Sequence, residues 1–255
     1  MWIRSLPESL ASEPRTRFVI FSSARSGTSL VTATLDQHPD ICCHAEIFHE
    51  KRENHIQKAF RDTHDVDLLA QRPVKLARTV LGWTPGPPVV GFKMWTWQAP
   101  AAARKLLKDA GVHKIIIERK NRLAAFSSVR LAFTTGTWNR WPGEGLPREA
   151  PPLLPFDVDM FREFCDRQDK LFASYREQAR GPVLDVVYAD LPEPGITAMQ
   201  DFLGVAPRDL NPRRLKLHPD NILSRFDPAA HAAIEAELAR IGRPDWVREM
   251  RGNAD

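Results

Sequence analysis

The stretch that most constrains the fold lies between Arg17 and Glu46. An apolar run from Phe18 to Phe21 is long enough for one buried strand, and small polar residues around Gly27 follow it. Apolar residues then recur at roughly helical spacing until His38-Pro39, where the proline ends the helix. The pattern predicts a strand, a tight loop and the N-terminus of a helix in direct succession.

The polar loop of this unit has the residue types of an anion-binding site. A helix N-terminus aims unpaired backbone N–H groups at one point, and the helix dipole adds partial positive charge there. Gly27 lets the backbone approach a ligand closely. Further donors are the hydroxyls of Ser26, Thr28 and Ser29 and the cation of Arg25. An ordinary capped helix is the alternative, but an arginine directly after a buried strand favours a phosphate-like anion.

The loop is not a Walker A motif. That motif has the form G-x-x-x-x-G-K-[ST], with a lysine after the second glycine. In this chain Thr28 follows Gly27, and Ser22 stands where the first glycine would be. A kinase or an ATPase is therefore disfavoured at the most diagnostic position of its motif.

Length and composition indicate one domain, 1–255, with one sizeable core. The chain has 255 residues, of which 43% are hydrophobic, and no stretch approaches the roughly 20 apolar residues of a membrane span. The first ten residues contain no apolar signal core, so we expect a cytoplasmic protein. A net charge of +4 suits anionic ligands, but no run of basic residues indicates nucleic acid. The abundance of arginine, alanine and proline is typical of a GC-rich bacterial genome.

Strand and helix patterns alternate along the rest of the chain. Strands are predicted at 89–94, 113–118 and 183–188, and helices at 74–81, 100–110, 123–133, 156–179, 196–203 and 229–241. This alternation predicts an α/β layered fold with a central, mostly parallel sheet flanked by helices. We expect residues 1–16 to form an N-terminal arm and the proline-rich residues 134–156 to form a loop that covers the substrate.

A second anion site is predicted on the unit that begins with the isoleucine-rich strand. Arg119 follows this strand directly, and Ser127 lies eight residues further on, about two helical turns into the next helix. An arginine and a serine in this arrangement can donate to one anion from two sides. The alternative is that Arg119 pairs with a surface carboxylate. Because parallel strands end at one edge of the sheet, Arg119, Lys93 and the first loop should lie together there, which favours a nucleotide with phosphates at both ends.

These segments resemble the sulfotransferases that use 3′-phosphoadenosine 5′-phosphosulfate (PAPS), in the bacterial carbohydrate and natural-product branch. S-S-A-R-S-G-T-S-L is similar to their 5′-phosphosulfate loop, and I-I-I-E-R-K-N-R-L-A-A-F-S-S to their 3′-phosphate motif. G-F-K-M-W-T-W is similar to the lysine-bearing strand of nodulation-factor and trehalose sulfotransferases. H-P-D-I-C-C-H-A-E-I-F and V-V-Y-A-D-L resemble the acceptor-side segment and the late Tyr-Glu-Asp-Leu segment. The resemblance implies the sulfotransferase fold, a P-loop-like three-layer sandwich.

The resemblance also implies an activity and a role for each candidate residue. A sulfuryl group would pass in line from PAPS to a hydroxyl of a carbohydrate, glycolipid or natural product, with a carboxylate as general base. Glu46 is the expected base, with His44 and His49 as alternatives, and Lys93 is a second cation near the transferred group. The 5′-phosphosulfate would lie on Arg25, Ser26, Gly27, Thr28 and Ser29, and the 3′-phosphate on Arg119 and Ser127.

The chain departs from the cytosolic sulfotransferases in two segments. Ala24-Arg25 replaces their Pro-Lys pair, and their late Arg-Lys-Gly segment has no counterpart apart from Arg213-Arg214 with Lys216. Three cysteines form neither a disulfide framework nor a zinc site with a spaced second pair, so no metal is expected. A divergent kinase and a non-catalytic nucleotide-binding protein remain alternatives, and the oligomeric state, including a homodimer, stays open. Candidate aromatic faces for the acceptor are Trp83, Trp95, Trp97, Trp138 and Trp141.

Overall fold

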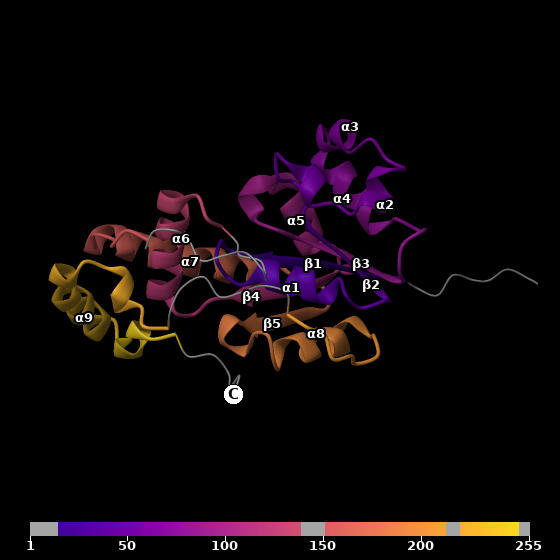
Figure 1. Ribbon diagram of the computed structural model, residues 1–255. Helices are drawn as coiled ribbons and strands as arrows, with labels where there is room; N and C mark the ends of the chain where they lie inside the picture. The colour runs from indigo at the N-terminus through magenta and orange to yellow at the C-terminus, as the bar shows by residue number, and fades with distance from the viewer. Residues whose placement is uncertain (1–14, 139–150, 213–219, 250–255) are drawn as a thin grey trace, which may run out of the picture.

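A computed structural model describes residues 15–138, 151–212 and 220–249. A five-stranded parallel sheet with the order β2-β3-β1-β4-β5 lies at the centre (Figure 1). The strands are β1 (Thr16–Ser22), β2 (Ile41–Glu46), β3 (Val89–Met94), β4 (His113–Glu118) and β5 (Val183–Val187). The longer helices are α1 (Thr28–Leu35), α4 (Pro73–Leu81), α5 (Pro100–Lys108), α6 (Arg122–Thr135), α7 (Val158–Gln178), α8 (Gly195–Leu203) and α9 (His231–Arg240), with short helices α2 (Lys58–Arg61) and α3 (Val66–Ala70) between β2 and α4.

Helices cover both faces of the sheet, which confirms the predicted α/β three-layer fold. Along β1, Val19 and Phe21 pack on one face with the apolar side chains of α4, α5 and α7. Phe18 and Ile20 point to the opposite face, where α1 and α8 cover them. This alternation follows from the two-residue period of a strand, and burial on both faces explains why β1 is an uninterrupted apolar run.

A third apolar cluster joins α6, α7 and α9 beyond the end of the sheet. Phe126 of α6 packs against Phe161 of α7, and Leu238 of α9 belongs to the same cluster. In Figure 1, α6 and α9 lie beside the sheet, on the side away from α2, α3 and α4. The cluster holds the segments that follow residue 220 against the start of α6, where one of the two predicted anion sites lies.

The predicted elements match the described ones closely, with small differences at their ends. The strand at 89–94 and the strand at 113–118 have the predicted bounds, while α5 is two residues shorter and α7 three residues shorter than predicted. Residues 1–14 of the expected arm and 139–150 of the expected substrate loop lie outside the described residues. At the described end of that loop, Leu154 is buried and its N–H donates to the carbonyl of Arg225 at 2.9 Å.

None of the helices in the described ranges is both long enough and apolar enough to span a bilayer.

Replacing Gly91 with alanine should destabilise the sheet. A Cβ at this position would lie 2.4 Å from the ring of Phe18, its register partner on β1, and neither central strand can move away. Overpacking of this kind costs about 1–3 kcal/mol of unfolding free energy. Urea denaturation measures the loss, with Gly111→Ala as the control because its Cβ would meet only the mobile ends of two surface side chains. Equal stability of the two variants would contradict the packing described for β1 and β3.

Candidate functional site

The loop between β1 and α1 has the backbone geometry of an anion cradle. Arg25 and Gly27 both have left-handed backbone conformations, with φ of 63° and 76°. No side chain caps the N-terminus of α1, which leaves its first N–H groups without a capping acceptor. A Cβ at Gly27 would lie 2.9 Å from the ring of Tyr188, so only glycine fits this turn. The predicted loop residues therefore form a tight turn over an uncapped helix end, which fits a phosphate group.

The side chain of Arg25 reaches across to α6. Its Nε donates to Oγ of Ser128 at 2.9 Å, and its Nη1 donates to the carbonyl of Trp138. Burial and the nearby cation of Arg119 lower the pKa of Arg25 to about 10. Ser128 is a contact that the sequence pattern did not indicate, because Ser127 is the serine at the motif spacing. Arg25 thus links the first predicted anion site to the helix that carries the second.

Glu46 and Lys93 form a buried ion pair at the ends of adjacent strands. A bulge in β2 after His44 brings Glu46 into register with Lys93 of β3, and the Lys93 Nζ lies 3.0 Å from Oε1 of Glu46. The two side chains are 9% and 3% exposed. Lys93 also donates to Oγ of Ser29 at 2.9 Å, and Nε2 of Gln98 donates to Oε2 of Glu46 at 2.9 Å. The pair therefore joins the predicted base to the predicted phosphate loop.

The charge state of Glu46 depends on these neighbours. Burial raises the pKa of its carboxyl group, but Lys93, together with Gln98 and His55, outweighs burial and holds the pKa below its usual value of 4.5. Glu46 is consequently ionised at neutral pH. Each carboxylate oxygen accepts one of these bonds and retains a second acceptor direction. A hydroxyl group can therefore still donate to it.

The two histidines considered as alternative bases lie in different surroundings. His44 is buried against Phe60, its Nδ1 accepts from the N–H of Gln57 at 3.0 Å, and burial lowers its pKa to about 4. That ring is a neutral core residue. His49 is more exposed and its ring lies 4.5 Å from that of His55. His55, which the sequence did not single out, accepts from the N–H of Glu46 at 3.4 Å, and its charge helps to lower the pKa of Glu46.

The second predicted site is built differently from the sequence expectation. Arg119 donates from Nη1 to the carbonyl of Arg25 at 3.0 Å, and its guanidinium lies 4.5 Å from the ring centre of Tyr188. Its remaining edge pairs with Glu249, a buried carboxylate rather than the surface carboxylate considered above. The hydroxyl of Ser127 bonds to other groups: its Oγ accepts from Nη1 of Arg225 at 3.0 Å and donates to the carbonyl of Ala124 at 3.2 Å.

Arg225 is therefore a member of the cluster that sequence reasoning missed. It is buried, and burial together with Arg119 lowers its pKa to about 10. The sequence predicts a basic loop around it, in which no motif distinguishes it from its neighbours, whereas the structure has a 3-10 helix at Leu223–Arg225. Arg213, Arg214 and Lys216, the expected substitutes for the late basic segment, lie outside the described residues. Arg25, Arg119 and Arg225 together place three guanidinium groups at one edge of the sheet, two of them buried and that of Arg25 partly buried.

Two further features of the described residues bear on the site. Over residues 15–138, 151–212 and 220–249, no group of three or more His, Cys, Asp or Glu side chains is arranged to hold a metal ion.

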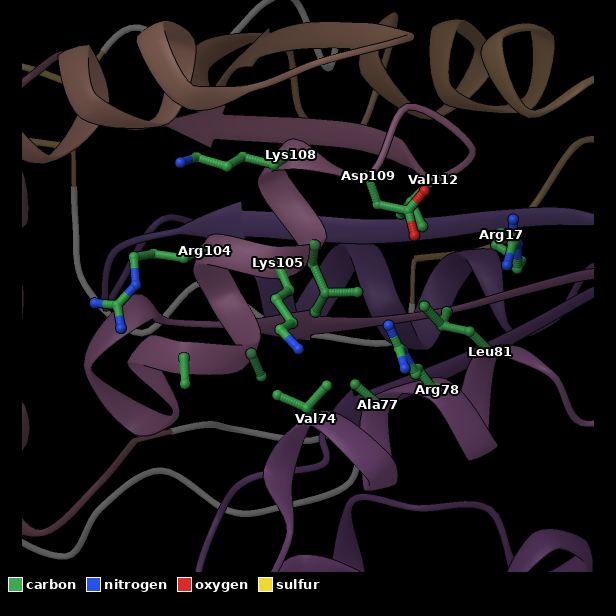
Figure 2. Close-up of a pocket in the computed structure, with 13 residues that line it drawn as sticks. Arg17, Val74, Ala77, Arg78, Leu81, Arg104, Lys105, Lys108, Asp109 and Val112 are labelled. Atoms are coloured by element: carbon green, nitrogen blue, oxygen red, sulfur yellow. The ribbon is translucent and has the colours of Figure 1, made fainter.

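A groove of about 810 Å³ lies between α4 and α5, with Arg17, Arg78 and Lys105 among its lining residues (Figure 2). Because Arg17 is near the start of β1 and Val112 precedes β4, this groove lies at the opposite strand ends from the candidate site.

The strand order defines an α/β protein in which a tight, glycine-containing turn leads from the first strand to an uncapped helix N-terminus. No family model matches the chain. The chain is 26% identical over 212 residues to Nodulation protein H of Rhizobium tropici. The match covers 79% of this chain and 78% of that relative. This relationship supports the resemblance to sulfotransferases that the motifs indicate.

Two solved structures are also similar to this chain. The crystal structure of a sulfotransferase from Alicyclobacillus acidocaldarius is 20% identical and has a TM-score of 0.46, with 92% of this chain and 99% of that one covered. The sulfotransferase domain of the olefin synthase of Synechococcus PCC 7002 is 18% identical with a TM-score of 0.40, and the match covers 88% and 85% of the two chains. Since both TM-scores are below 0.5, the fold assignment rests on the strand order of this chain itself.

Replacing Lys93 with methionine should cost more stability at pH 7 than at pH 4. In the wild type the pKa of Glu46 is below 4.5, so the pair stabilises the fold above that pH and loses its effect as pH falls through the lowered pKa. Without Lys93 a buried carboxylate loses its cation, which costs about 3–5 kcal/mol when it must be ionised. Urea denaturation at the two pH values measures the difference. The double variant with Glu46→Gln should recover part of the loss at pH 7, and an equal loss at both pH values would contradict the buried pair.

Proposed function

We propose that this protein transfers a sulfuryl group from PAPS to a hydroxyl group of a carbohydrate, glycolipid or natural product. The observation that carries the proposal is the junction of two arginine-bearing loops, made by the bond from Arg119 to the carbonyl of Arg25. Positive groups at two connected loops suit a donor with phosphate at both ends of its ribose. The buried Lys93–Glu46 pair beside the first loop suits the transfer step.

The residues of the first loop bind and stabilise the leaving group in this proposal. In the transfer, the acceptor oxygen forms a bond to sulfur while the bond from sulfur to the 5′-phosphate oxygen breaks. Negative charge then grows on that phosphate, and in this proposal it is stabilised by the N-terminal N–H groups of α1, by the hydroxyls of Ser26, Thr28 and Ser29 and by the Arg25 cation. Preorganised donors aimed at developing charge are worth about 10²–10³ in rate each.

Glu46 removes the acceptor proton, and Lys93 couples this step to the leaving group. Lys93 donates both to Glu46 and to Ser29 of the phosphate loop. As charge grows at the loop, the ammonium group is drawn away from the carboxylate, whose pKa then rises. The base is therefore strengthened as the bond to sulfur forms. Gln98 keeps the second carboxylate oxygen oriented through its own bond.

The acceptor and the cellular setting are part of the same proposal. Trp97 is 71% exposed and lies next to Gln98, so its face is available to an acceptor sugar or lipid. Trp83 is buried against His44 and Phe60 and belongs to the core, and Trp141 lies outside the described residues. We still predict that the protein is cytoplasmic and bacterial and that it has no nucleic-acid partner. A substrate loop at 134–156 and a homodimer are also still predictions.

The direct test is a transfer assay with PAPS that carries radiolabelled sulfate. The protein is incubated with pooled extracts of hydroxyl-bearing metabolites and glycans, and labelled products are identified by mass spectrometry. Label in an organic product supports the proposal. Magnesium-dependent hydrolysis of ATP would instead indicate a kinase-like enzyme, and nucleotide binding without transfer to any acceptor would indicate a non-catalytic binding protein.

Replacing Glu46 with glutamine should lower turnover strongly and leave nucleotide affinity nearly unchanged. The amide cannot accept the proton of the acceptor, and loss of a general base typically costs about 10²–10⁴ in rate. Steady-state kinetics give kcat, and calorimetry with the product nucleotide, adenosine 3′,5′-bisphosphate, gives affinity. A parallel fall of turnover and affinity would reject Glu46 as the base.

Replacing Arg119 with alanine should weaken binding of adenosine 3′,5′-bisphosphate by roughly 10–100-fold, because a charged hydrogen-bonding group is worth about 1.5–3 kcal/mol. Affinity for adenosine 5′-monophosphate, which lacks the 3′-phosphate, should change far less. Arg162→Ala is the matched control, since Arg162 pairs with Glu237 outside the cluster. Unchanged affinity for the bisphosphate in Arg119→Ala would contradict the 3′-phosphate role.

A further inference from the structure

A carboxylate from the last described segment occupies the edge of Arg119 on which a phosphate would bind. Glu249 accepts from Nε of Arg119 at 2.8 Å and, with its other oxygen, from Nη2 of the same side chain. Nη1 of Arg119 meanwhile donates to the carbonyl of Arg25. The Nε–Nη2 edge can hold a carboxylate or a phosphate through two parallel bonds, but not both at once.

The surroundings of Glu249 suit a phosphate better than a single carboxylate. Arg225 and Arg25 lie close enough to Arg119 for their charges to affect one another, and Glu249 is the carboxylate that opposes this repulsion at Arg225. Both Arg119 and Glu249 are buried, at 5% and 6% exposure. Three guanidinium groups in one cluster, two of them buried, favour a ligand with two negative charges over one with a single charge.

The backbone that carries Glu249 is held mainly by contacts that do not involve its side chain. Residues 244–249, named here the C-terminal latch, are anchored by Asn121, whose Nδ2 donates to the carbonyls of Trp246 and Arg248 at 3.1 and 2.8 Å. The N–H of Ile222 donates to the carbonyl of Val247 at 2.8 Å. Beyond these anchors, Glu249 itself is held by its pair with Arg119 and by one bond from its N–H to the carbonyl of Asp220. Its carboxylate can therefore leave Arg119 while the rest of the latch stays in place.

We propose that Glu249 closes the second anion site in the free protein and that the 3′-phosphate of the donor nucleotide must displace it. This inference rests on the proposed function. The latch acts as an internal competitor. The observed association constant for a 3′-phosphorylated nucleotide is therefore the intrinsic constant multiplied by the fraction of free molecules in which Glu249 has left Arg119. A nucleotide without a 3′-phosphate does not compete with Glu249 and is unaffected by the latch.

The test compares nucleotide binding by the wild type and by Glu249→Gln. The neutral amide keeps the shape of the side chain but lacks the charge that holds Arg119. If the latch is closed in about nine tenths of free molecules, its removal should tighten binding of adenosine 3′,5′-bisphosphate about tenfold. Binding of adenosine 5′-monophosphate should stay the same. Isothermal titration calorimetry at one fixed salt concentration measures both.

Glu237→Gln is the matched control variant. Glu237 of α9 is also a buried carboxylate, and it accepts from Arg162 of α7 and Arg240 of α9 rather than from the three arginines of the cluster. Its replacement should leave both nucleotide affinities unchanged. Circular dichroism of the three proteins checks that each is folded. Folded Glu249→Gln that binds the bisphosphate no better than the wild type would overturn the latch.

A structure of the wild type with adenosine 3′,5′-bisphosphate gives a second readout that needs no variant. The latch predicts a 3′-phosphate on the Nε–Nη2 edge of Arg119 and a Glu249 side chain turned away. An intact Arg119–Glu249 pair beside the bound nucleotide would overturn the latch and leave the proposed function standing. No binding of the bisphosphate by either the wild type or Glu249→Gln would overturn the proposed function, and the latch with it.

Discussion

The gathering of three guanidinium groups at one edge of the sheet, two buried and one partly buried, is the constraint on which the rest of the site depends. Arg25, Arg119 and Arg225 repel one another, and burial adds to the cost, as the lowered pKa values of Arg25 and Arg225 show. A fold retains such a cluster only when it is compensated by hydrogen bonds and by negative charge. The compensating groups are the carbonyl of Arg25, the serines of α6 and the carboxylate of Glu249.

The parallel sheet explains how residues distant in sequence reach this edge. β1 and β4 are neighbours and run in the same direction, so the loops that follow them lie side by side. β3 flanks β1 on the other side and brings Lys93 to the first loop, while the bulge of β2 turns Glu46 toward it. Strand order thus places the expected leaving-group donors, the base and the second arginine around one point, as open α/β sheets do for their ligands.

Much of this arrangement was predictable from the sequence because it is local. The apolar runs of β1, β3 and β4, and the turn at Gly27, are each contained within a few consecutive residues. The contacts that escaped prediction join segments that no local pattern links. Glu249 bonds to Arg119, which lies 130 residues away in the sequence, and Arg225 bonds to Ser127, which lies 98 residues away. These contacts follow from the packing of α6 with the last described segments. His44 was considered a base because of its place near Glu46, but tertiary packing makes it a core residue.

The central claim is that this cluster recognises both phosphates of one nucleotide. The measurement that tests it most directly is calorimetric titration of the intact wild type with adenosine 3′,5′-bisphosphate and, separately, with adenosine 5′-monophosphate. The account predicts that the bisphosphate binds tighter by about tenfold or more, since the 3′-phosphate adds charged hydrogen bonds. Equal affinities, or no heat with the bisphosphate from correctly folded protein, would contradict it.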